Sequence, residues 1–505
     1  MMCAEMGAKS IACEKKQTRR IRECILRTAN SIANCSTCVQ LPSEITDNET
    51  MRSVLSAYYR LPDQWGTSDH VNSVGQTGFF RFGSKIICYG NSESGVAPQS
   101  DNAQSFDALK SVHREGSEIH LPFDISEVIE NLRREHYVKQ LSPESKRIGH
   151  SRIIRNAYYF CRHLLPNPLR RALQRSYFEG WKNLPFPSWP VDFTVDELHK
   201  EYLRLCMEAK GQTKIPFIWF WPDGAPNGLI LTHDVETITG RDMTSRLMDL
   251  DSSYGFRASI QVVPEERYGV PDSYVDEIRG RGFEFNVHDL NHDGNLYRNH
   301  SEFLLRAKKI NEYVHKYNSQ GFRSGAMYRN VDWYDAFEFS YDMSVPNVAH
   351  LEPQRGGCCT VMPYFLGRIL EIPLTTSQDY SLFHILNDYS IELWKEQVDR
   401  IRAKNGLISF IAHPDYLVES RARGVYEKLL TYLTQLVKRE KIWMALPRDV
   451  DNWWRARNEM KLVWNGSDWE IVGPQRERAR LAYASVQDGE LQYEVSGVLQ
   501  EGVRL

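Results

Sequence analysis

The chain has 505 residues, of which 42% are apolar and 25% are charged, and its formal net charge is −3. This length exceeds one ordinary domain, and the composition is that of a globular protein with a large buried core. The nearly balanced charge argues against a nucleic acid as partner, and no apolar run approaches the roughly 18 residues of a membrane-spanning helix.

Residues 1–50 are polar and weakly periodic, so we expect a loosely ordered N-terminal segment. No apolar h-region stands near the first residue, so we expect no secretory signal. A cytoplasmic location is therefore predicted. The ten cysteines are scattered, and Cys35 and Cys38 form a lone C-x-x-C pair. Because a second pair is missing, we interpret them as reduced thiols rather than a zinc or redox site.

Residues 51–200 are predicted to form an N-terminal α+β or helical region. The segment 78–90 has the composition of one or two short strands. The segment 124–138 has helical periodicity, with Asp124 as the expected N-cap and Glu127 completing a capping-box pattern.

The stretch 146–175 differs from the rest of this region because it contains eight Lys or Arg residues, no acid and several interleaved aromatic residues. A basic amphipathic helix of this kind can lie peripherally on an anionic membrane surface. It can equally cover a neighbouring domain with its side-chain stems. Both interpretations stay open, and the first predicts a position at the inner face of the membrane.

Short apolar runs alternate with helical segments between residues 215 and 457, after a Pro-rich linker at 186–192. This alternation predicts parallel strands with crossover helices, and the number of units favours a distorted (β/α) barrel with about seven or eight parallel strands. The apolar runs are GLILTHD, RASIQVVP, FEFNVHD, GFRSG, DMSVPN, EIPLTTS, LISFIAHP and IWMALP. Residues 458–505 alternate with period two around two turn signals, which predicts a small antiparallel β appendage.

Polar side chains follow several of these predicted strands. Asp234 and Glu236 are two apart in a strand, which places them on one face at the barrel mouth. His288 and His292 are four apart and converge if the chain turns after its strand. One carboxylate and two histidines are a common ligand set of open zinc sites. The second carboxylate could then act as general base. His413, at the end of another predicted strand, could protonate a leaving amine.

Five segments in this order resemble the motifs of the polysaccharide deacetylase family, also called carbohydrate esterase family 4 or the NodB-like homology domain. They are LTHDVE, HDLNH, GFRSG, TTSQDYSLF and FIAHPDY, and the resemblance covers about residues 220–450. It implies a distorted (β/α) barrel that removes acetyl groups from sugars with zinc or another divalent metal as cofactor.

The resemblance also implies roles for individual residues. Asp234 matches the catalytic base, and the metal ligands match Glu236, His288 and His292. Arg323 matches the arginine that orients the base, Asp379 the acid of the fourth motif and His413 the catalytic acid.

The chain departs from the family pattern at four places, which indicates a divergent member. Glu236 stands where the family has Asp, so Asp234 is an alternative metal ligand. Asp289 replaces a hydroxyl residue in the second motif, Gly325 replaces the proline of the third, and the tryptophan of the fourth motif is absent.

The function predicted from these motifs is a metal-dependent hydrolase that removes an N-acetyl group from an amino sugar, in a polysaccharide or a glycan precursor. A gene set for exopolysaccharide biosynthesis would suit such an enzyme. Two alternatives remain: a hydrolase of a non-sugar amide, and a non-catalytic glycan-binding or assembly protein that keeps the barrel.

Several residues also have purely structural interpretations. Arg323 could form a surface ion pair, Asp379 could cap a helix, and His413 could stabilise its loop. Asp293 could accept a hydrogen bond from a ligand imidazole or serve as a turn residue. The pair Trp453–Trp454 could stack on sugar rings but is better explained by packing of the last helix.

Overall fold

A computed structural model describes residues 53–65, 76–140, 178 and 180–497 of the chain. The predicted loosely ordered segment 1–50, with its Cys35–Cys38 pair, lies outside the described residues, and so does the basic stretch 146–175. Among the helices described, none is long and apolar enough to cross a membrane.

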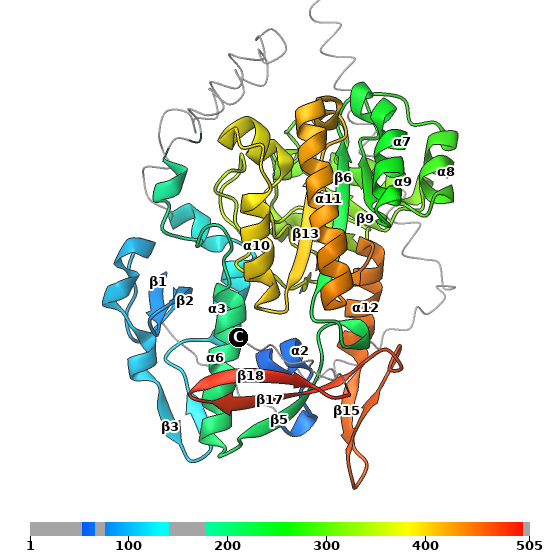
Figure 1. Cartoon of the computed structure of the whole chain (residues 1–505). Coiled ribbons are helices and arrows are strands. Elements are labelled where there is room, and N and C mark those ends of the chain that lie inside the picture. The colour runs from blue at the N-terminus through cyan, green and yellow to red at the C-terminus, as the bar shows by residue number, and fades with distance from the viewer. Residues whose placement is uncertain (1–52, 66–75, 141–177, 179, 498–505) are drawn as a thin grey trace, which may run out of the picture. The chain divides into compact units, whose positions relative to one another are not determined.

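The candidate site is built on a sheet in which the described residues form nine strands (Figure 1). Strand β11 pairs antiparallel with β12, and the other neighbouring strands pair parallel. In spatial order the strands are β11 (Tyr364–Leu366), β12 (Ile369–Glu371), β10 (Tyr341–Asp342), β9 (Gly321–Arg323), β8 (Glu284–His288), β7 (Ser259–Val262), β6 (Gly228–Val235) and β13 (Leu407–Ala412), and β14 (Trp443–Met444) pairs with the start of β6.

The sheet is curled. The segment 373–376, which follows β12 near one end of the sheet, lies against β13 at the other end. Side chains make this junction: Thr375 Oγ1 donates to the carbonyl of Leu407 at 2.8 Å, and Ser409 Oγ donates to the carbonyl of Pro373 at 2.7 Å. Thr376 Oγ1 also donates to the carbonyl of Ser409. Hydroxyl groups therefore join the two ends of the sheet, in place of the regular backbone ladder of a symmetrical barrel.

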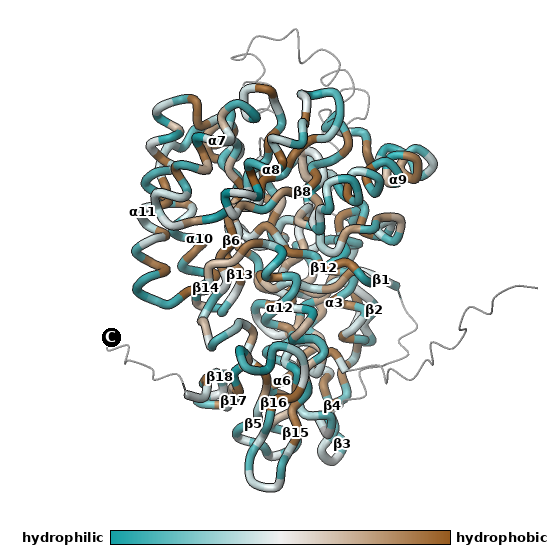
Figure 2. The backbone as a smooth tube through the Cα atoms, turned by 90° about the vertical axis from the view of Figure 1, so that its right-hand side faces the viewer, coloured by the Kyte–Doolittle hydropathy of each residue, from teal (hydrophilic) through white to brown (hydrophobic). Residues whose placement is uncertain are grey.

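Helices follow the strands along the chain, which confirms the predicted α/β class with mainly parallel strands. In Figure 1, β13 is seen between helices α10 and α11. Hydrophilic and hydrophobic colours alternate along α11 in Figure 2, as expected of a helix that buries one face. The helices are α7 (Ile238–Ser253), α8 (Asp272–Gly280), α9 (His300–Lys316), α10 (Glu392–Arg402), α11 (Ser420–Glu440) and α12 (Pro447–Glu459).

The region before the sheet contains short hairpins and helices. Asp124 caps α3 as predicted, because its carboxylate accepts from the amides of Ser126 and Glu127 at 2.8 and 3.1 Å. The elements of this region are α2 (Val54–Tyr59), β1 (Thr77–Phe82), β2 (Ile86–Asn91), β3 (His113–Glu115), β4 (Glu118–His120), α3 (Ile125–Arg133), α6 (Thr194–Ala209) and β5 (Lys214–Ile218).

The last strands are β15 (Lys461–Trp464), β16 (Trp469–Val472), β17 (Leu481–Gln487) and β18 (Glu490–Val495). They form antiparallel hairpins, and β17 also pairs antiparallel with β5. One hydrophobic core joins these strands, the N-terminal region and the start of the large sheet. Trp453 lies in that core with 1% of its surface exposed, which favours the packing role over sugar stacking.

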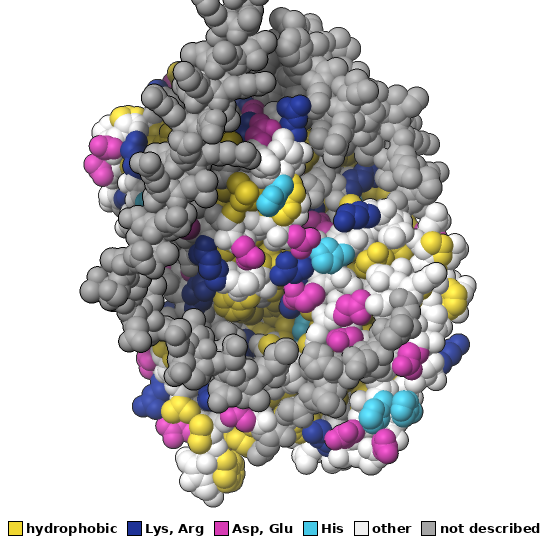
Figure 3. Space-filling view, turned by 180° about the vertical axis from the view of Figure 1, so that it is seen from behind, with side chains coloured by type: hydrophobic (Ala, Val, Ile, Leu, Met, Phe, Trp, Pro, Cys, Tyr) yellow, Lys and Arg dark blue, Asp and Glu magenta, His cyan; other side chains and the backbone are white. Residues whose placement is uncertain are grey.

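On the face drawn in Figure 3, acidic and basic described side chains are interspersed, in keeping with the nearly balanced net charge. A broad surface of one sign, such as polyanion binding uses, is not seen among the described residues of this face.

Candidate metal centre

Two neighbouring regions at the carboxyl end of the sheet supply a group of metal-ligating side chains. Strand β6 carries Asp234 near its end and Glu236 follows it, while His288 is the last residue of β8. Because β6, β7 and β8 run parallel, their ends meet at one edge of the sheet. One ligand atom each from Glu236, His288 and His292 lies within 4.8 Å of the other two.

The chain after β8 turns sharply and brings His292 back toward His288. Asp289 and His292 have left-handed backbone conformations, with φ of 57° and 55°, and the Asp289 carboxylate accepts from the amide of Leu290 at 2.7 Å. The Nδ1 atom of His288 lies 3.0 Å from the carbonyl oxygen of Arg323. A carbonyl can only accept, so the proton sits on Nδ1, and Nε2 presents its lone pair.

The donor atoms of Glu236, His288 and His292 are arranged as the ligands of a divalent metal ion would be. His292 Nε2 lies 3.0 Å and His288 Nε2 3.9 Å from Glu236 Oε1, and neither buried nitrogen makes a hydrogen bond of good geometry. Buried polar atoms are normally paired, and two imidazole nitrogens with one carboxylate form the ligand set of many open zinc sites. A cation between them would satisfy all three groups.

Glu236 is ionised in this environment. Burial alone would raise the pKa of its carboxyl, but His292, His288 and His413 together hold that pKa well below its usual value. The carboxylate therefore offers a negative charge to a cation at ordinary pH.

Asp234 is held beside this group by a buried arginine. Arg323 Nη1 donates to Asp234 Oδ1 at 2.7 Å and to Thr232 Oγ1 at 2.8 Å, while Nε donates to the carbonyl of Met343 at 3.0 Å. Although burial opposes ionisation, Arg323 and the nearby histidines lower the pKa of Asp234. Its other oxygen, Oδ2, lies 3.8 Å from His288 Nε2. With 2% of its surface exposed, Arg323 is no surface ion pair.

His413 and Asp379 form a second buried pair on the other side of Glu236. His413 Nδ1 lies 2.6 Å from Asp379 Oδ1, its backbone amide donates to Asp379 Oδ2 at 2.7 Å, and its Nε2 lies 3.5 Å from Glu236 Oε1. Burial disfavours the imidazolium, yet Asp379 and Glu236 raise the pKa of His413 well above its usual value. Asp379 also accepts from the amide of Tyr380, so it supports both the histidine and the following turn.

The structure gives Asp293 a structural contact. Both of its oxygens pair with Arg306 at 2.8 Å, and Oδ1 also accepts from the amide of Asn295. These contacts stabilise the loop after His292, as the interpretation of Asp293 as a turn residue expects.

Sequence reasoning missed Glu352, which lies close to the second pair. Gln378 Nε2, one residue before Asp379, donates to Glu352 Oε2 at 2.6 Å. Burial raises the pKa of Glu352 to about 7, against the opposing effects of Gln378, Arg329 and His413. Glu352 lies in an irregular loop without periodicity, so no sequence pattern marked it.

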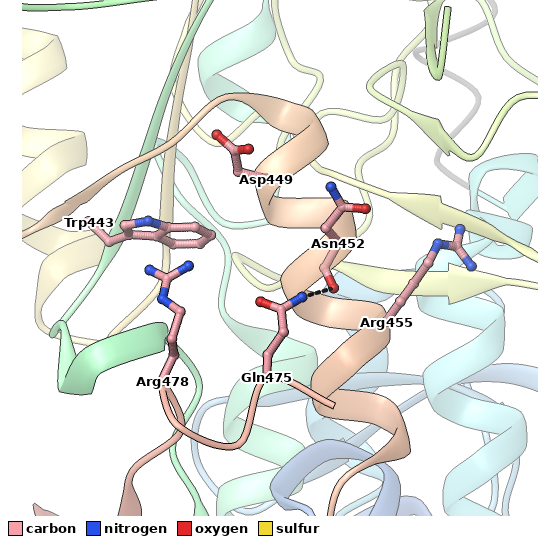
Figure 4. A pocket seen from close by; sticks show the side chains of 6 residues that line it. All are labelled: Trp443, Asp449, Asn452, Arg455, Gln475 and Arg478. Carbon is pink, nitrogen blue, oxygen red and sulfur yellow. Dashed lines mark hydrogen bonds between the residues drawn. The ribbon is translucent and has the colours of Figure 1, made fainter. Parts of the chain in front are cut away.

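A surface pocket of about 510 Å³ lies at the opposite end of the sheet (Figure 4). One of its walls is Trp443, which pairs with the first residue of β6, whereas Glu236 follows the last. Arg478 faces the Trp443 ring in Figure 4 and is already paired with Asp223. Histidine is absent from the lining, so we place no metal chemistry there. The pocket is lined by Trp443, Asp449, Asn452, Arg455, Gln475 and Arg478.

Several solved structures match about half of this chain in fold. A polysaccharide deacetylase from Mycobacterium smegmatis is 16% identical, covers 50% of this chain and 98% of its own, and has a TM-score of 0.39. PuuE allantoinase is 13% identical over 46% of this chain and 92% of its own, with a TM-score of 0.37. A CE4-family pseudoenzyme from Bacillus anthracis is 14% identical over 45% and 65%, with a TM-score of 0.30.

No family model matches the chain, and no curated protein matches it significantly. At these identities and TM-scores the matched structures indicate a similar fold and nothing about activity. We therefore derive the function from the site itself.

Proposed function

We propose that the chain is a metal-dependent hydrolase that removes an N-acetyl group from an amino sugar in a polysaccharide or glycan precursor. The observation that carries this proposal is the convergence of Glu236, His288 and His292, whose buried imidazole nitrogens both face the Glu236 carboxylate without a well-aligned hydrogen bond. The choice of an acetylated glycan rests on the resemblance of the five sequence motifs to those of polysaccharide deacetylases.

Glu236, His288 and His292 would hold the metal, with zinc as the first choice. When bound, a divalent cation supplies a Lewis acid for the acyl carbonyl and makes an attacking water more acidic. Both nitrogens and the carboxylate come from segments that the sheet holds at one edge, so little rearrangement is needed to bind it.

Asp234 is the proposed general base. It is ionised and held at Oδ1 by Arg323, which leaves Oδ2 to take the proton of the attacking water. Because this carboxylate is already engaged with Arg323, we assign the ligand role to Glu236.

His413 is the proposed general acid. Its Nδ1 proton is held by Asp379, and its Nε2 lies 3.5 Å from Glu236 Oε1. A protonated Nε2 can donate its proton to the amide nitrogen after water has added to the carbonyl carbon, so that the C–N bond breaks and the amine leaves. Asp379 thus acts by orienting and charging His413.

The test is acetate release from N-acetylhexosamine oligomers by the zinc-loaded protein. Replacing Asp234 by Asn should lower the rate by about 100-fold or more, because general base catalysis contributes typically 10²–10⁴-fold. Asp249→Asn, at an exposed acid of α7, serves as the matched control. An unchanged rate in Asp234→Asn would refute the base assignment, and turnover of sugar-free amides alone would identify the non-sugar alternative.

A further inference from the structure

A single buried carboxylate of the N-terminal region contacts two distant segments beside the candidate site. Glu135 follows α3 with a left-handed backbone, at φ of 60°, and 8% of its surface is exposed. Its Oε2 accepts from Arg329 Nε at 2.6 Å, and its Oε1 accepts from Arg329 Nη2 and from the amide of Gly357 at 2.5 Å. These partners lie 194 and 222 positions further along the chain.

The first of these segments, 325–329, abuts a proposed metal ligand. Arg329 Nη1 donates to the carbonyl of Met327 at 2.8 Å, which ties the guanidinium to the turn before it. At the start of that turn, a Cβ on Gly325 would lie 3.0 Å from His292 Cδ2 and 2.4 Å from Asp289 Oδ2. The backbone therefore packs directly against His292, and its position limits where that ring can lie.

The second segment, 347–357, leads to the proposed general acid. Glu135 accepts the amide proton of Gly357, while Tyr137 donates to the carbonyl of the same residue at 2.7 Å. Glycine is required there, because φ is 144° and a Cβ would lie 2.2 Å from the carbonyl oxygen of Asn347. The same loop carries Glu352, which accepts from Gln378, the neighbour of Asp379.

We propose that Glu135 is a positioning residue that sets the geometry of both halves of the candidate site, by joining the segment against His292 to the loop that supports Asp379 and His413. The N-terminal region then contributes to the geometry of the hydrolase site through Glu135. The guanidinium fork fixes direction as well as distance, which a single-point contact would not do. For its role in the reaction, this inference rests on the proposed function.

Coupling between two sites is reciprocal, so a metal that is bound more tightly because of Glu135 must itself strengthen the contacts of Glu135. Hydrogen exchange of the unaltered full chain, with and without zinc, measures this directly. We expect zinc to slow exchange about tenfold in peptides that contain the amide of Gly357 and the segment 325–329, within the usual range of coupling between sites. The hairpin β15–β16 is the internal control and should not change.

Variants test the same link from the other side. Glu135→Gln keeps the shape of the side chain but removes the charge, and zinc affinity should fall about tenfold, the lower end of the range for loss of a ligand's support. Glu284→Gln is the matched control, because Glu284 is also buried and hydrogen-bonded but lies at the start of β8, away from His288. Its zinc affinity should equal that of the parent.

The outcomes separate the two claims. Zinc binding without added protection at Gly357, or with equal affinity in a folded Glu135→Gln variant, overturns the positioning role and leaves the proposed function standing. Absence of zinc binding by the unaltered protein overturns both. If Glu135→Gln does not fold, the exchange experiment on the unaltered chain still decides.

Discussion

Glu284 provides a quantitative test of the electrostatics inside the sheet, because a buried carboxyl with a raised pKa makes stability depend on pH. It begins β8, has 4% of its surface exposed, and accepts hydrogen bonds from the hydroxyl of Tyr341 and the amide of Arg448. Burial raises the pKa of Glu284 to about 7, against the opposing effects of Tyr341 and Arg448.

The sign follows from proton binding in the two states. Between pH 4.5, the ordinary pKa, and about 7, the folded state keeps the Glu284 proton while the unfolded state has lost it. Stability from this group is therefore highest below pH 4.5 and falls as the pH rises to about 7. A difference of roughly 2.5 pKa units corresponds to about 3 kcal/mol in the free energy of unfolding.

Replacing Glu284 by Gln removes this ionisation. The variant should match the parent to within about 1 kcal/mol near pH 5 and be more stable by up to about 3 kcal/mol near pH 8. Urea unfolding of both proteins at several pH values between 5 and 8 measures the difference, and the other titrating groups cancel in it. A stability difference that does not change with pH would refute the reasoning about this carboxyl.

Three further predictions concern other parts of the molecule. Gly357→Ala should lower the free energy of unfolding by about 3 kcal/mol or more from backbone strain and close contact, whereas Gly255→Ala, also at positive φ but in open space, should lose much less in the same denaturation assay. Arg323→Lys keeps the charge but loses the planar guanidinium that bonds Asp234 and Thr232 through Nη1 and the carbonyl of Met343 through Nε, so kcat should fall about tenfold or more while zinc content measured by atomic absorption stays at the parent's level; a parallel loss of zinc would contradict the orienting role. The membrane interpretation of the segment 146–175 predicts that the protein co-sediments with anionic vesicles at low salt, whereas the alternative, that this segment covers a neighbouring domain, predicts no binding; equal co-sedimentation with neutral vesicles would exclude an electrostatic contact.

Much of the sheet was predictable because buried parallel strands appear in sequence as continuous apolar runs. Six of the eight runs between residues 215 and 457 contain strands, from GLILTHD in β6 to IWMALP in β14. The runs DMSVPN and EIPLTTS contain only the last residues of β10 and β12. The proximity of Glu236, His288 and His292 followed from the same pattern, since the ends of parallel strands share one edge.

The remaining contacts depend on pairs far apart in the chain that no local pattern encodes. The hydrogen bonds of Glu135 span about 200 residues, and its neighbourhood contains only a short amphipathic helix. Likewise, Thr375 and Ser409, whose hydroxyl groups join the ends of the sheet, cannot be told apart in the sequence from other strand residues. Strand β17 belongs to the segment predicted to form a small β appendage. It pairs with β5, which lies at the start of the predicted barrel.

Metal content is the most direct test of the central claim that Glu236, His288 and His292 form a metal site. Purified protein, loaded with zinc and passed over a desalting column, should retain about one equivalent per chain, and so should Asp234→Asn. Glu236→Ala should lose most of it, because the remaining two imidazoles hold zinc weakly. Zinc retained by Glu236→Ala but lost from Asp234→Asn would reverse the two assignments, and a parent protein without zinc would contradict the account as a whole.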